Sequence, residues 1–320
     1  MHTATNKPDL IVPPFAVYVE DRKYLKNVSP KTLTWFVDAW KAFGPHLEPA
    51  LANGGRLPDA LKAAVLALLE KGVRPVSVNS YLTCARAYLN WLHSEGHLRE
   101  KPKVQLLKFE QKVLATFSQE HVEALLTLKP KGRNQARAHV ICCLLLDSGL
   151  RISEALNIRR DQLDFENLLI RVTGKGNKQR LVPMSLELRK QLFRWLQRCP
   201  KDFVFGTRCG TKMTVRNFQR DFKAICIKLK IADVRCSPHT LRHTFAVSYL
   251  RAGGNLFYLS KILGHTSVKT TERYLQSLQP QDLQAVHDRL SLLTTPCPTA
   301  KPRYFDSLRP RSKFRGDETS

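Results

Sequence analysis

The sequence has no long hydrophobic run and no apolar segment behind a basic N-terminus. A membrane-spanning helix needs about 20 consecutive apolar residues, and no such stretch occurs among the 320 residues of the chain. The first residues, MHTATNKPDLIVPP, lack the apolar region of a secretory signal. We therefore expect no membrane partner and no export.

Paired cysteines of the C-x-x-C type are also missing. The eight cysteines are scattered, and Cys142 and Cys143 lie inside an apolar run. Disulfide frameworks and structural zinc sites have regular cysteine spacings, which this chain lacks. We expect reduced, mostly buried thiols in a cytoplasmic protein.

Acidic residues are scarce relative to basic ones. The chain has 27 Asp and Glu against 52 Lys and Arg, which gives a net charge of +25 and an isoelectric point near 10.0. This excess favours a polyanionic partner, with nucleic acid first and an anionic membrane surface or a ribosomal context as alternatives. Residues 111–293 carry 31 basic and 14 acidic residues, so we expect this block to make most of the phosphate contacts.

The N-terminal third has the patterns of a small helical domain. VSPKTLTWFVDAWKAFG predicts a helix with Ser29 as N-cap, Pro30 in its first turn and Gly44 at its end. Residues 57–72 and 77–96 predict two more helices with apolar stripes. A lysine-rich segment without clear periodicity follows, and we interpret it as a linker.

The rest of the chain predicts helices around one β-hairpin. Ser118 is a predicted N-cap, and LLIRVTGKGNKQRLVPM (168–184) contains two β-type runs on either side of a Gly-rich turn. Further helices are predicted at 136–149, 185–198, 215–230, 238–254, 255–263, 267–278 and 281–293. The expected fold is mainly α with a small β-hairpin or sheet, in the α+β class.

The composition changes along the chain set the predicted domain boundaries. They are an N-terminal extension (1–19), a helical domain (20–98), a linker (99–116), a second domain (117–293) and a basic, proline-rich tail expected to be disordered (294–320). No internal repeat is visible.

Four short motifs carry polar residues that could do chemistry. The motifs GLRISEAL, TGKGNKQRLVP, HTLRH and LGHTSVKTTERYL contain Arg151, Lys175, His239, Arg242, His265 and Tyr274. Taken singly, each has an ordinary explanation, such as a surface cap, a solvated turn lysine, a polar helix face or a packing tyrosine. Only their combination is informative.

A zinc site is the first alternative for the histidines. His239 and His243 are four residues apart and could share a metal ion on one helix face. The residues between them are Thr-Leu-Arg, so the metalloprotease glutamate is absent and the cationic Arg242 would oppose a dication. We predict no metal and no cofactor.

Together, the six residues meet the chemical demands of attack on a phosphodiester. Two arginines can hold the non-bridging oxygens, and histidines and a lysine can exchange protons with the attacking and leaving oxygens. Neighbouring cations favour the ionised, nucleophilic form of a tyrosine hydroxyl. None of these roles requires a metal or ATP, because a phosphotyrosine linkage conserves the bond energy.

The order Arg, Lys, His-x-x-Arg, His and Tyr resembles the tyrosine recombinase (phage integrase) family. SGLRISEAL, TGKGNKQRLVPM, SPHTLRHTFAVSYLRAGG and LGHTSVKTTERYL are similar to the motifs of its Xer-type and transposon integrases. The resemblance covers about residues 20–290. It implies a helical, SAM-like core-binding domain and a catalytic domain that together clamp DNA in a C shape. It argues against the integron branch, because no long insertion separates Lys175 from His239.

The resemblance also implies a role for each residue. Tyr274 would attack the scissile phosphate, form a 3′-phosphotyrosyl link and release a 5′-hydroxyl. Arg151 and Arg242 would hold the phosphate, and His265 would donate to it. Lys175 would be the general acid and His239 the general base. Glu154, one turn beyond Arg151, would steady the site framework.

The implied activity is site-specific recombination of double-stranded DNA through a Holliday junction in a homotetramer. The expected location is the nucleoid of a bacterial cytoplasm. A type IB topoisomerase or telomere-resolving enzyme shares this chemistry, and a DNA-binding regulator on the same scaffold would lack a catalytic residue. Whether the terminal helix, 281–293, packs on its own domain or on a neighbouring subunit stays open.

Overall fold

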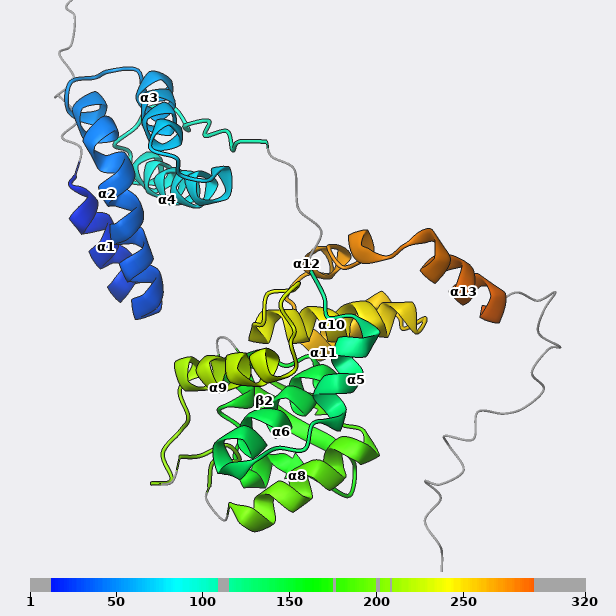
Figure 1. The fold of residues 1–320 in the computed structure, drawn as a ribbon. Coiled ribbons are helices and arrows are strands. Elements are labelled where there is room, and N and C mark those ends of the chain that lie inside the picture. The colour runs from blue at the N-terminus through cyan, green and yellow to red at the C-terminus, as the bar shows by residue number, and fades with distance from the viewer. Residues whose placement is uncertain (1–12, 109–114, 175–176, 200–201, 208, 291–320) are drawn as a thin grey trace, which may run out of the picture. The chain divides into compact units, whose positions relative to one another are not determined.

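The computed structural model describes residues 13–108, 115–174, 177–199, 202–207 and 209–290. The chain divides into two compact units, Met1–Gln111 and Lys112–Ser320, each with its own core (Figure 1). The mainly helical fold with one small sheet confirms the predicted fold class. In the part of the chain that the structure describes, no helix is long and apolar enough to cross a membrane.

The first unit is a bundle of four helices. They are α1 (Phe15–Tyr24), α2 (Pro30–Ala52), α3 (Leu57–Glu70) and α4 (Pro75–Ser94). The Ser29 hydroxyl accepts the Thr32 N–H and caps α2, as predicted. Tyr18, Phe43 and Leu89 are among the side chains buried at the centre of the bundle.

Two boundaries in this unit differ from the sequence prediction. The helix predicted to end at Gly44 continues through Pro45 and Pro49 to Ala52. Gly44 is buried against the Trp40 indole, and a Cβ there would lie 2.8 Å from the indole nitrogen. The glycine therefore makes room for packing and does not end the helix.

The second difference concerns the segment predicted to be an N-terminal extension. Helix α1 begins at Phe15, and Phe15 stacks on Trp40 with ring centroids 4.2 Å apart. Tertiary packing of its aromatic rings holds this short helix, and the local pattern gives little sign of it. In the predicted linker, residues 101–108 have no helix or strand, but the Asn79 side chain binds both backbone groups of Leu107 at 2.8 and 2.9 Å.

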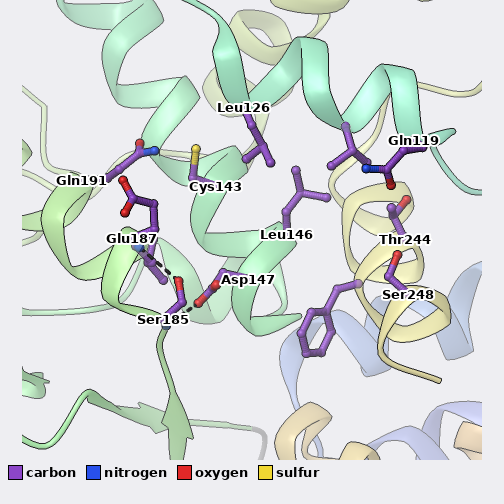
Figure 2. Close-up of a pocket in the computed structure, with 13 residues that line it drawn as sticks. Gln119, Leu126, Cys143, Leu146, Asp147, Ser185, Glu187, Gln191, Thr244 and Ser248 are labelled. Carbon is purple, nitrogen blue, oxygen red and sulfur yellow. Dashed lines mark hydrogen bonds between the residues drawn. The ribbon is translucent and has the colours of Figure 1, made fainter. Parts of the chain in front are cut away.

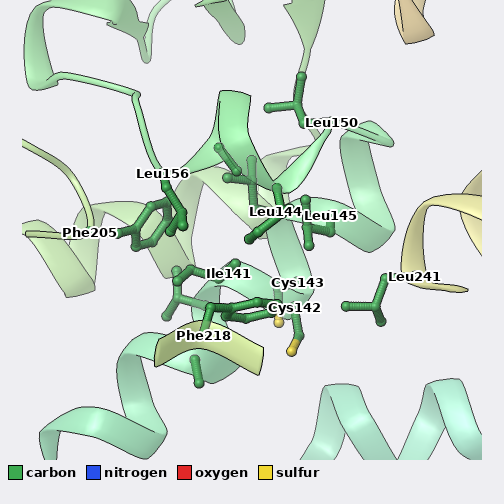
Figure 3. Packing of buried hydrophobic residues seen from close by; sticks show 14 of the residues in the cluster. Ile141, Cys142, Cys143, Leu144, Leu145, Leu150, Leu156, Phe205, Phe218 and Leu241 are labelled. Atoms are coloured by element: carbon green, nitrogen blue, oxygen red, sulfur yellow. The ribbon is translucent and has the colours of Figure 1, made fainter. Parts of the chain in front are cut away.

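The second unit packs helices around α6. Its first elements are α5 (Gln119–Thr127), α6 (Gly132–Ser148) and α7 (Ile152–Ala155), followed by the 3-10 helix η1 (Arg160–Gln162). Ile141, Leu144 and Leu145 of α6 are buried, and Figure 3 shows them among Leu156, Phe205 and Phe218. Ser118 caps α5 through the His121 N–H, as predicted.

A three-stranded antiparallel sheet follows. The strands are β1 (Leu163–Asp164), β2 (Leu169–Thr173) and β3 (Gln179–Pro183), in the order β1-β2-β3. The β2–β3 pair confirms the predicted hairpin, with Val172 opposite Arg180. Strand β1 was not predicted, since a two-residue strand has no alternation to detect.

Four further helices match the predicted ones closely. They are α8 (Leu186–Arg198), α9 (Val215–Lys228), α10 (Pro238–Arg251) and α11 (Leu256–Leu263). Ser185, Thr214, Ser237 and Asn255 cap their N-termini through side-chain oxygens.

The helix predicted over residues 267–278 is broken in the structure. It consists of α12 (Lys269–Glu272), a turn at Arg273 and Tyr274, and the 3-10 helix η3 (Leu275–Ser277). The buried residues Thr271, Tyr274 and Ser277 are three apart, which is the repeat of a 3-10 helix. Burial of these three side chains favours the broken conformation over the continuous α-helix that the local sequence predicts.

The last described helix is α13 (Pro280–Leu290). Its first turn is tied to α10 by an ion pair between Arg251 Nε and Asp282 Oδ2 at 3.0 Å. The Leu283 side chain on the predicted apolar face is exposed. The predicted end of this helix at residue 293 and the predicted disordered tail lie outside the described residues.

Candidate active site

The predicted site residues come from separate segments of the second unit. Arg151 precedes α7, His239 and Arg242 lie on α10, His265 follows α11, and Tyr274 lies between α12 and η3. Lys175 lies outside the described residues.

Two glycines in the left-handed conformation place carbonyl groups at this site. Gly149 ends α6 with φ 61° and Gly264 ends α11 with φ 65°, a region that other residues rarely adopt. A side chain at Gly149 would collide with the Phe245 ring. The carbonyl oxygens of both glycines accept hydrogen bonds from arginines of the site.

Arg242 is the most deeply buried of these arginines, with 4% of its surface exposed. Its Nη1 donates to Gly149 O at 2.7 Å, and its Nη2 donates to Leu263 O at 2.9 Å. Burial, assisted by the charge of Arg151, lowers the pKa of Arg242 to about 10. The guanidinium is still cationic at neutral pH.

Arg151 lies closer to solvent and is held by Glu154. Its side chain is 38% exposed, and its Nη1 donates to Glu154 Oε1 at 3.0 Å. The other carboxylate oxygen accepts the Arg151 backbone N–H at 2.9 Å. Burial alone would raise the pKa of Glu154, but hydrogen bonds from Arg180 and from the Arg151 backbone outweigh it and lower that pKa. Glu154 is therefore a buried carboxylate that orients Arg151.

The protonation state of His265 follows from its two contacts. Its Nε2 lies 2.9 Å from Arg242 Nη2, and its Nδ1 lies 2.7 Å from Thr271 Oγ1. A guanidinium has no acceptor, so Nε2 accepts a hydrogen bond from Arg242, and Nδ1 carries the imidazole proton. Burial and then the charge of Arg242 lower the pKa of His265 to about 4, which keeps the ring neutral at pH 7.

Tyr274 is buried, and the histidine in hydrogen-bond contact with it is His243. The His243 Nδ1 lies 3.3 Å from the Tyr274 hydroxyl, and only 2% of Tyr274 is exposed. Burial, followed by the charge of Arg273, lowers the pKa of His243 to about 4. The His265 ring is nearly parallel to that of Tyr274, with centroids 6.4 Å apart.

His239 lies at the edge of this group. Its ring centroid is 6.5 Å from that of His243, one helical turn away on α10. Burial and then the charge of Arg242 lower its pKa, so it too favours the neutral form. The structure thus gathers five of the six predicted positions within one region of the second unit.

Comparison with known proteins identifies the family. Residues 115–280, which contain all six predicted positions, match the phage integrase family. The chain belongs to the phage integrase family. It is a tyrosine recombinase, an enzyme that breaks and rejoins DNA strands.

Relatives of this integrase family member include bacterial Xer proteins. The chain is 34% identical over 230 residues to the tyrosine recombinase XerD of Lacticaseibacillus casei, covering 67% of this chain and 76% of XerD. It is 29% identical over 293 residues to XerC of Syntrophus aciditrophicus, covering 82% of this chain and 92% of XerC.

Solved structures of the family share the fold. The Tn1549 transposon integrase in complex with a circular intermediate DNA has a TM-score of 0.68 at 21% identity, with 86% of this chain and 98% of that chain covered. A lambda integrase dimer bound to a COC′ core site has a TM-score of 0.60 at 13% identity, with 80% and 96% covered.

Among the hollows on the second unit of this phage integrase family member, two differ in size and position. The larger, about 760 Å³, is lined by Arg151, Arg180, Gly264 and His265 and opens beside the predicted site. The other, about 330 Å³, lies between α5, α6, α8 and α10, and Figure 2 shows Leu126, Leu146 and Thr244 around it. Among the described residues, no group of three or more His, Cys, Asp or Glu could hold a metal ion.

Three residues of this recombinase site are not among those predicted from the sequence: His243, Thr271 and Arg180. His243 enters the sequence prediction only as a possible zinc ligand, although it neighbours Arg242 in the HTLRH motif. A polar residue within a motif was the available signal for each, but only the fold reveals which atoms they contact.

Proposed function

We propose that Tyr274 is the nucleophile with which this tyrosine recombinase cuts and rejoins DNA. The observation that carries the proposal is the position of the Tyr274 hydroxyl, 3.3 Å from His243 in a region that also holds Arg242 and His265. A tyrosine packed only for stability has no need of two arginines and two neutral histidines around it.

The proposed reaction is a transesterification at phosphorus. The Tyr274 oxygen forms a bond to the scissile phosphorus, and the bond from phosphorus to the 5′ oxygen breaks. The phenol proton passes to a histidine, and the leaving oxygen takes a proton from Lys175, the general acid that the family resemblance implies. A 5′-hydroxyl then attacks the phosphotyrosyl link and displaces Tyr274. The bond count is unchanged, so the reaction consumes no ATP.

Arg151 and Arg242 are the proposed ligands of the non-bridging oxygens. Planar guanidinium groups suit a phosphate because they donate paired hydrogen bonds and stabilise the charge of the transition state. Arg151 faces the larger hollow, whereas Arg242 already donates to two carbonyl oxygens. The proposal therefore includes a rearrangement in which DNA draws Arg242 and the buried Tyr274 toward the phosphate.

His265 is the proposed third donor to the phosphate, and this role requires a change of protonation. In the structure its Nε2 accepts a hydrogen bond from Arg242 and so cannot donate one. A phosphate beside the ring would raise its pKa, since a nearby negative charge favours the imidazolium. We propose that His265 gains its second proton when DNA binds.

Two histidines compete for the role of proton acceptor. The sequence pointed to His239, and His243 is the one within hydrogen-bond reach of Tyr274. A neutral imidazole with an unprotonated ring nitrogen can accept the phenol proton. Replacing each histidine by glutamine shows which of them accepts the proton. The variant that loses the acceptor should form the adduct roughly 10²- to 10⁴-fold more slowly.

The assembly and the location belong to the same proposal. We propose strand exchange through a Holliday junction in a tetramer, in the cytoplasm of a bacterium and associated with its nucleoid. The relatives named above are bacterial Xer recombinases, and the lambda integrase structure is a dimer bound to a core site. The proposed domain roles are a core-binding domain before the linker and a catalytic domain after it.

A covalent-trapping assay tests the proposal. Nicked duplexes covering the DNA on both sides of the gene are incubated with the protein in EDTA without ATP, and products are separated on a denaturing gel. Wild type should form a protein–DNA adduct that Tyr274→Phe does not form. An adduct that persists in the variant would assign the nucleophile to another residue.

The same material separates the recombinase from its alternatives. A topoisomerase should relax supercoiled plasmid that lacks any recombination site, whereas a recombinase should act only on plasmids with paired sites. Salt-sensitive binding without any adduct on the flanking DNA would favour a DNA-binding regulator or a recombination target that lies elsewhere.

A further inference from the structure

Arg180 lines the larger hollow together with Arg151 and His265, and it has no role in the reaction described above. It is the residue of β3 opposite Val172 of β2, and its side chain is 15% exposed. Its Nη1 and Nη2 donate to the two oxygens of Glu154 at 3.0 and 2.9 Å, and its Nε donates to Ile262 O at 2.9 Å. All three guanidinium nitrogens are therefore used inside the protein.

Glu154 is shared between Arg180 and Arg151. Each carboxylate oxygen accepts one hydrogen bond from the Arg180 side chain and one from Arg151, whose Nη1 and backbone N–H both donate. A paired, bidentate arrangement of this kind fixes the plane of the carboxylate. The position of Arg151 thus depends on where Arg180 holds Glu154.

Arg180 also contacts the end of α11, where His265 begins. A Cβ on Gly264 would lie 2.8 Å from Cζ of Arg180, so the guanidinium lies against this glycine. Three successive carbonyls at this helix end accept hydrogen bonds from arginines: Ile262 from Arg180, Leu263 from Arg242 and Gly264 from Arg151. The segment that presents His265 is therefore held by arginines.

Gly174, which follows β2, lies against the same ion pair. A Cβ on Gly174 would lie 3.4 Å from Arg180 Nη1 and 3.5 Å from Glu154 Oε1. Strand β3, helix α7 and the end of α11 consequently meet at the Arg180 guanidinium.

We propose that Arg180 is a positioning residue for recombination, which holds Arg151 through Glu154 and His265 through the end of α11 without touching the phosphate. The inference rests on the proposed function, because it assigns Arg180 the task of orienting two proposed phosphate ligands. Lysine cannot replace it, because a single ammonium cannot bind both carboxylate oxygens in plane and also reach the Ile262 carbonyl. Misplacement of Arg151 by about 1 Å is enough to slow chemistry about 100-fold.

The test compares Arg180→Lys with the wild type in single-turnover cleavage of a nicked duplex. The matched control is Arg171→Lys, on the neighbouring strand β2, whose side chain is exposed. Each protein is given a normal scissile phosphodiester and a methylphosphonate, which is neutral and leaves Arg151 less charge to stabilise. Amide hydrogen exchange of Gly264 and His265, and of Leu144 in the α6 core, is measured without DNA.

We expect Arg180→Lys to cleave the phosphodiester roughly 10- to 100-fold more slowly than the wild type. On the methylphosphonate the difference should shrink to within about threefold, because the oriented charge of Arg151 matters less there. The Gly264 and His265 amides should exchange faster in Arg180→Lys and the Leu144 amide should not. Arg171→Lys should match the wild type in every measurement.

Phosphodiester cleavage by Arg180→Lys within about threefold of the wild type would overturn the proposal, whatever the exchange rates. Equal slowing on both substrates, with faster exchange at Leu144, would also overturn it, since the defect would then be a general loss of folding. A wild type that forms no adduct would count against the proposed function instead. In that case the exchange rates alone decide whether Arg180 holds the α11 end.

Discussion

At the scale of single residues, the two proposed phosphate ligands differ in how much of the fold depends on them. Arg242 is buried and supplies the hydrogen bonds to Gly149 O and Leu263 O, whereas Arg151 is partly exposed and reaches two carbonyls only at 3.4 Å. One arginine therefore serves both structure and chemistry, and the other serves mainly chemistry.

This difference predicts unequal stability losses. Arg242→Met removes the donor to Gly149 O and leaves Leu263 O with only the 3.4 Å bond from Arg151, so it should lower the free energy of unfolding by about 2–4 kcal/mol. Arg151→Met should lower it by less than about 1 kcal/mol, since Glu154 keeps both bonds from Arg180. Urea unfolding monitored by circular dichroism measures both. Equal losses would contradict the assignment, although both variants should fail to form the DNA adduct.

The neutral histidines predict a pH dependence of stability. His243 and His265 have pKa values of about 4 in the folded protein, below the value near 6.5 of an unfolded chain. Between these values the unfolded chain binds more protons, so the free energy of unfolding falls as pH decreases from about 6.5 toward 4. Their contribution is fully present above about pH 6.5.

The measurement is urea unfolding at pH 7.5 and 5.0 for wild type and His243→Gln. The variant lacks the His243 imidazole, whose pKa is lowered by folding. Its free energy of unfolding should therefore decrease less between the two pH values than that of the wild type. Parallel decreases in the two proteins would show that His243 is not held neutral by the fold.

At the scale of elements, the segment from α12 to η3 governs the position of Tyr274. The Thr271 hydroxyl accepts the His265 Nδ1 proton, and the Tyr274 N–H donates to Thr271 O at 3.0 Å. A single buried threonine thus links the predicted nucleophile to a proposed phosphate ligand.

Thr271→Val keeps the side-chain volume but removes the acceptor for His265. An unmet buried donor costs about 1–3 kcal/mol, so the free energy of unfolding should fall by this amount. The Tyr274 amide should also exchange faster with solvent. Thr271→Ser, which retains the hydroxyl, is the matched control and should have the smaller effect. No difference between valine and serine would rule out the link.

Helix ends and the hairpin could be predicted because their causes are local. Ser29 and Ser118 cap the helices predicted to follow them, and the Gly-rich turn of 168–184 joins two paired strands. The continuation of α2 past Gly44 and the break before Tyr274 could not be predicted in this way. Gly44 makes room for the indole of Trp40, one turn earlier on the same helix, and that indole stacks on Phe15 of α1. The break places Thr271, Tyr274 and Ser277 in one buried row, and neither arrangement is visible in local periodicity.

The candidate site also has a part that the sequence predicts and a part that it does not. Its motifs could be found from the order and type of residues, and the fold brings Arg151, Arg242, His265 and Tyr274 together, although their roles stay proposals. Their partners could not be found. Arg180 becomes a neighbour of the site only through the packing of β3 with α7 and α11, and His243 only through the packing of α10 with the segment between α12 and η3. Sequence spacing carries no information on such contacts.

At the scale of the whole molecule, charge is concentrated in the block that holds the site. Residues 111–293 have a net charge of +17, from 31 basic and 14 acidic residues. Each phosphate that a protein neutralises releases counterions, so the logarithm of affinity falls linearly with the logarithm of salt concentration.

Binding of duplex DNA should therefore weaken steeply with salt. With roughly six to ten phosphate contacts, affinity should drop about 10³- to 10⁵-fold between 50 and 200 mM salt. Tyr274→Phe is the protein to use, because a covalent adduct in the wild type would hide the equilibrium. Fluorescence anisotropy with a labelled duplex gives the slope, and the slope gives the number of phosphates contacted. An affinity that changes less than about tenfold over this range would mean that the excess charge does not face DNA. The slope is proportional to the number of phosphates contacted, so a small slope means that few phosphates are neutralised.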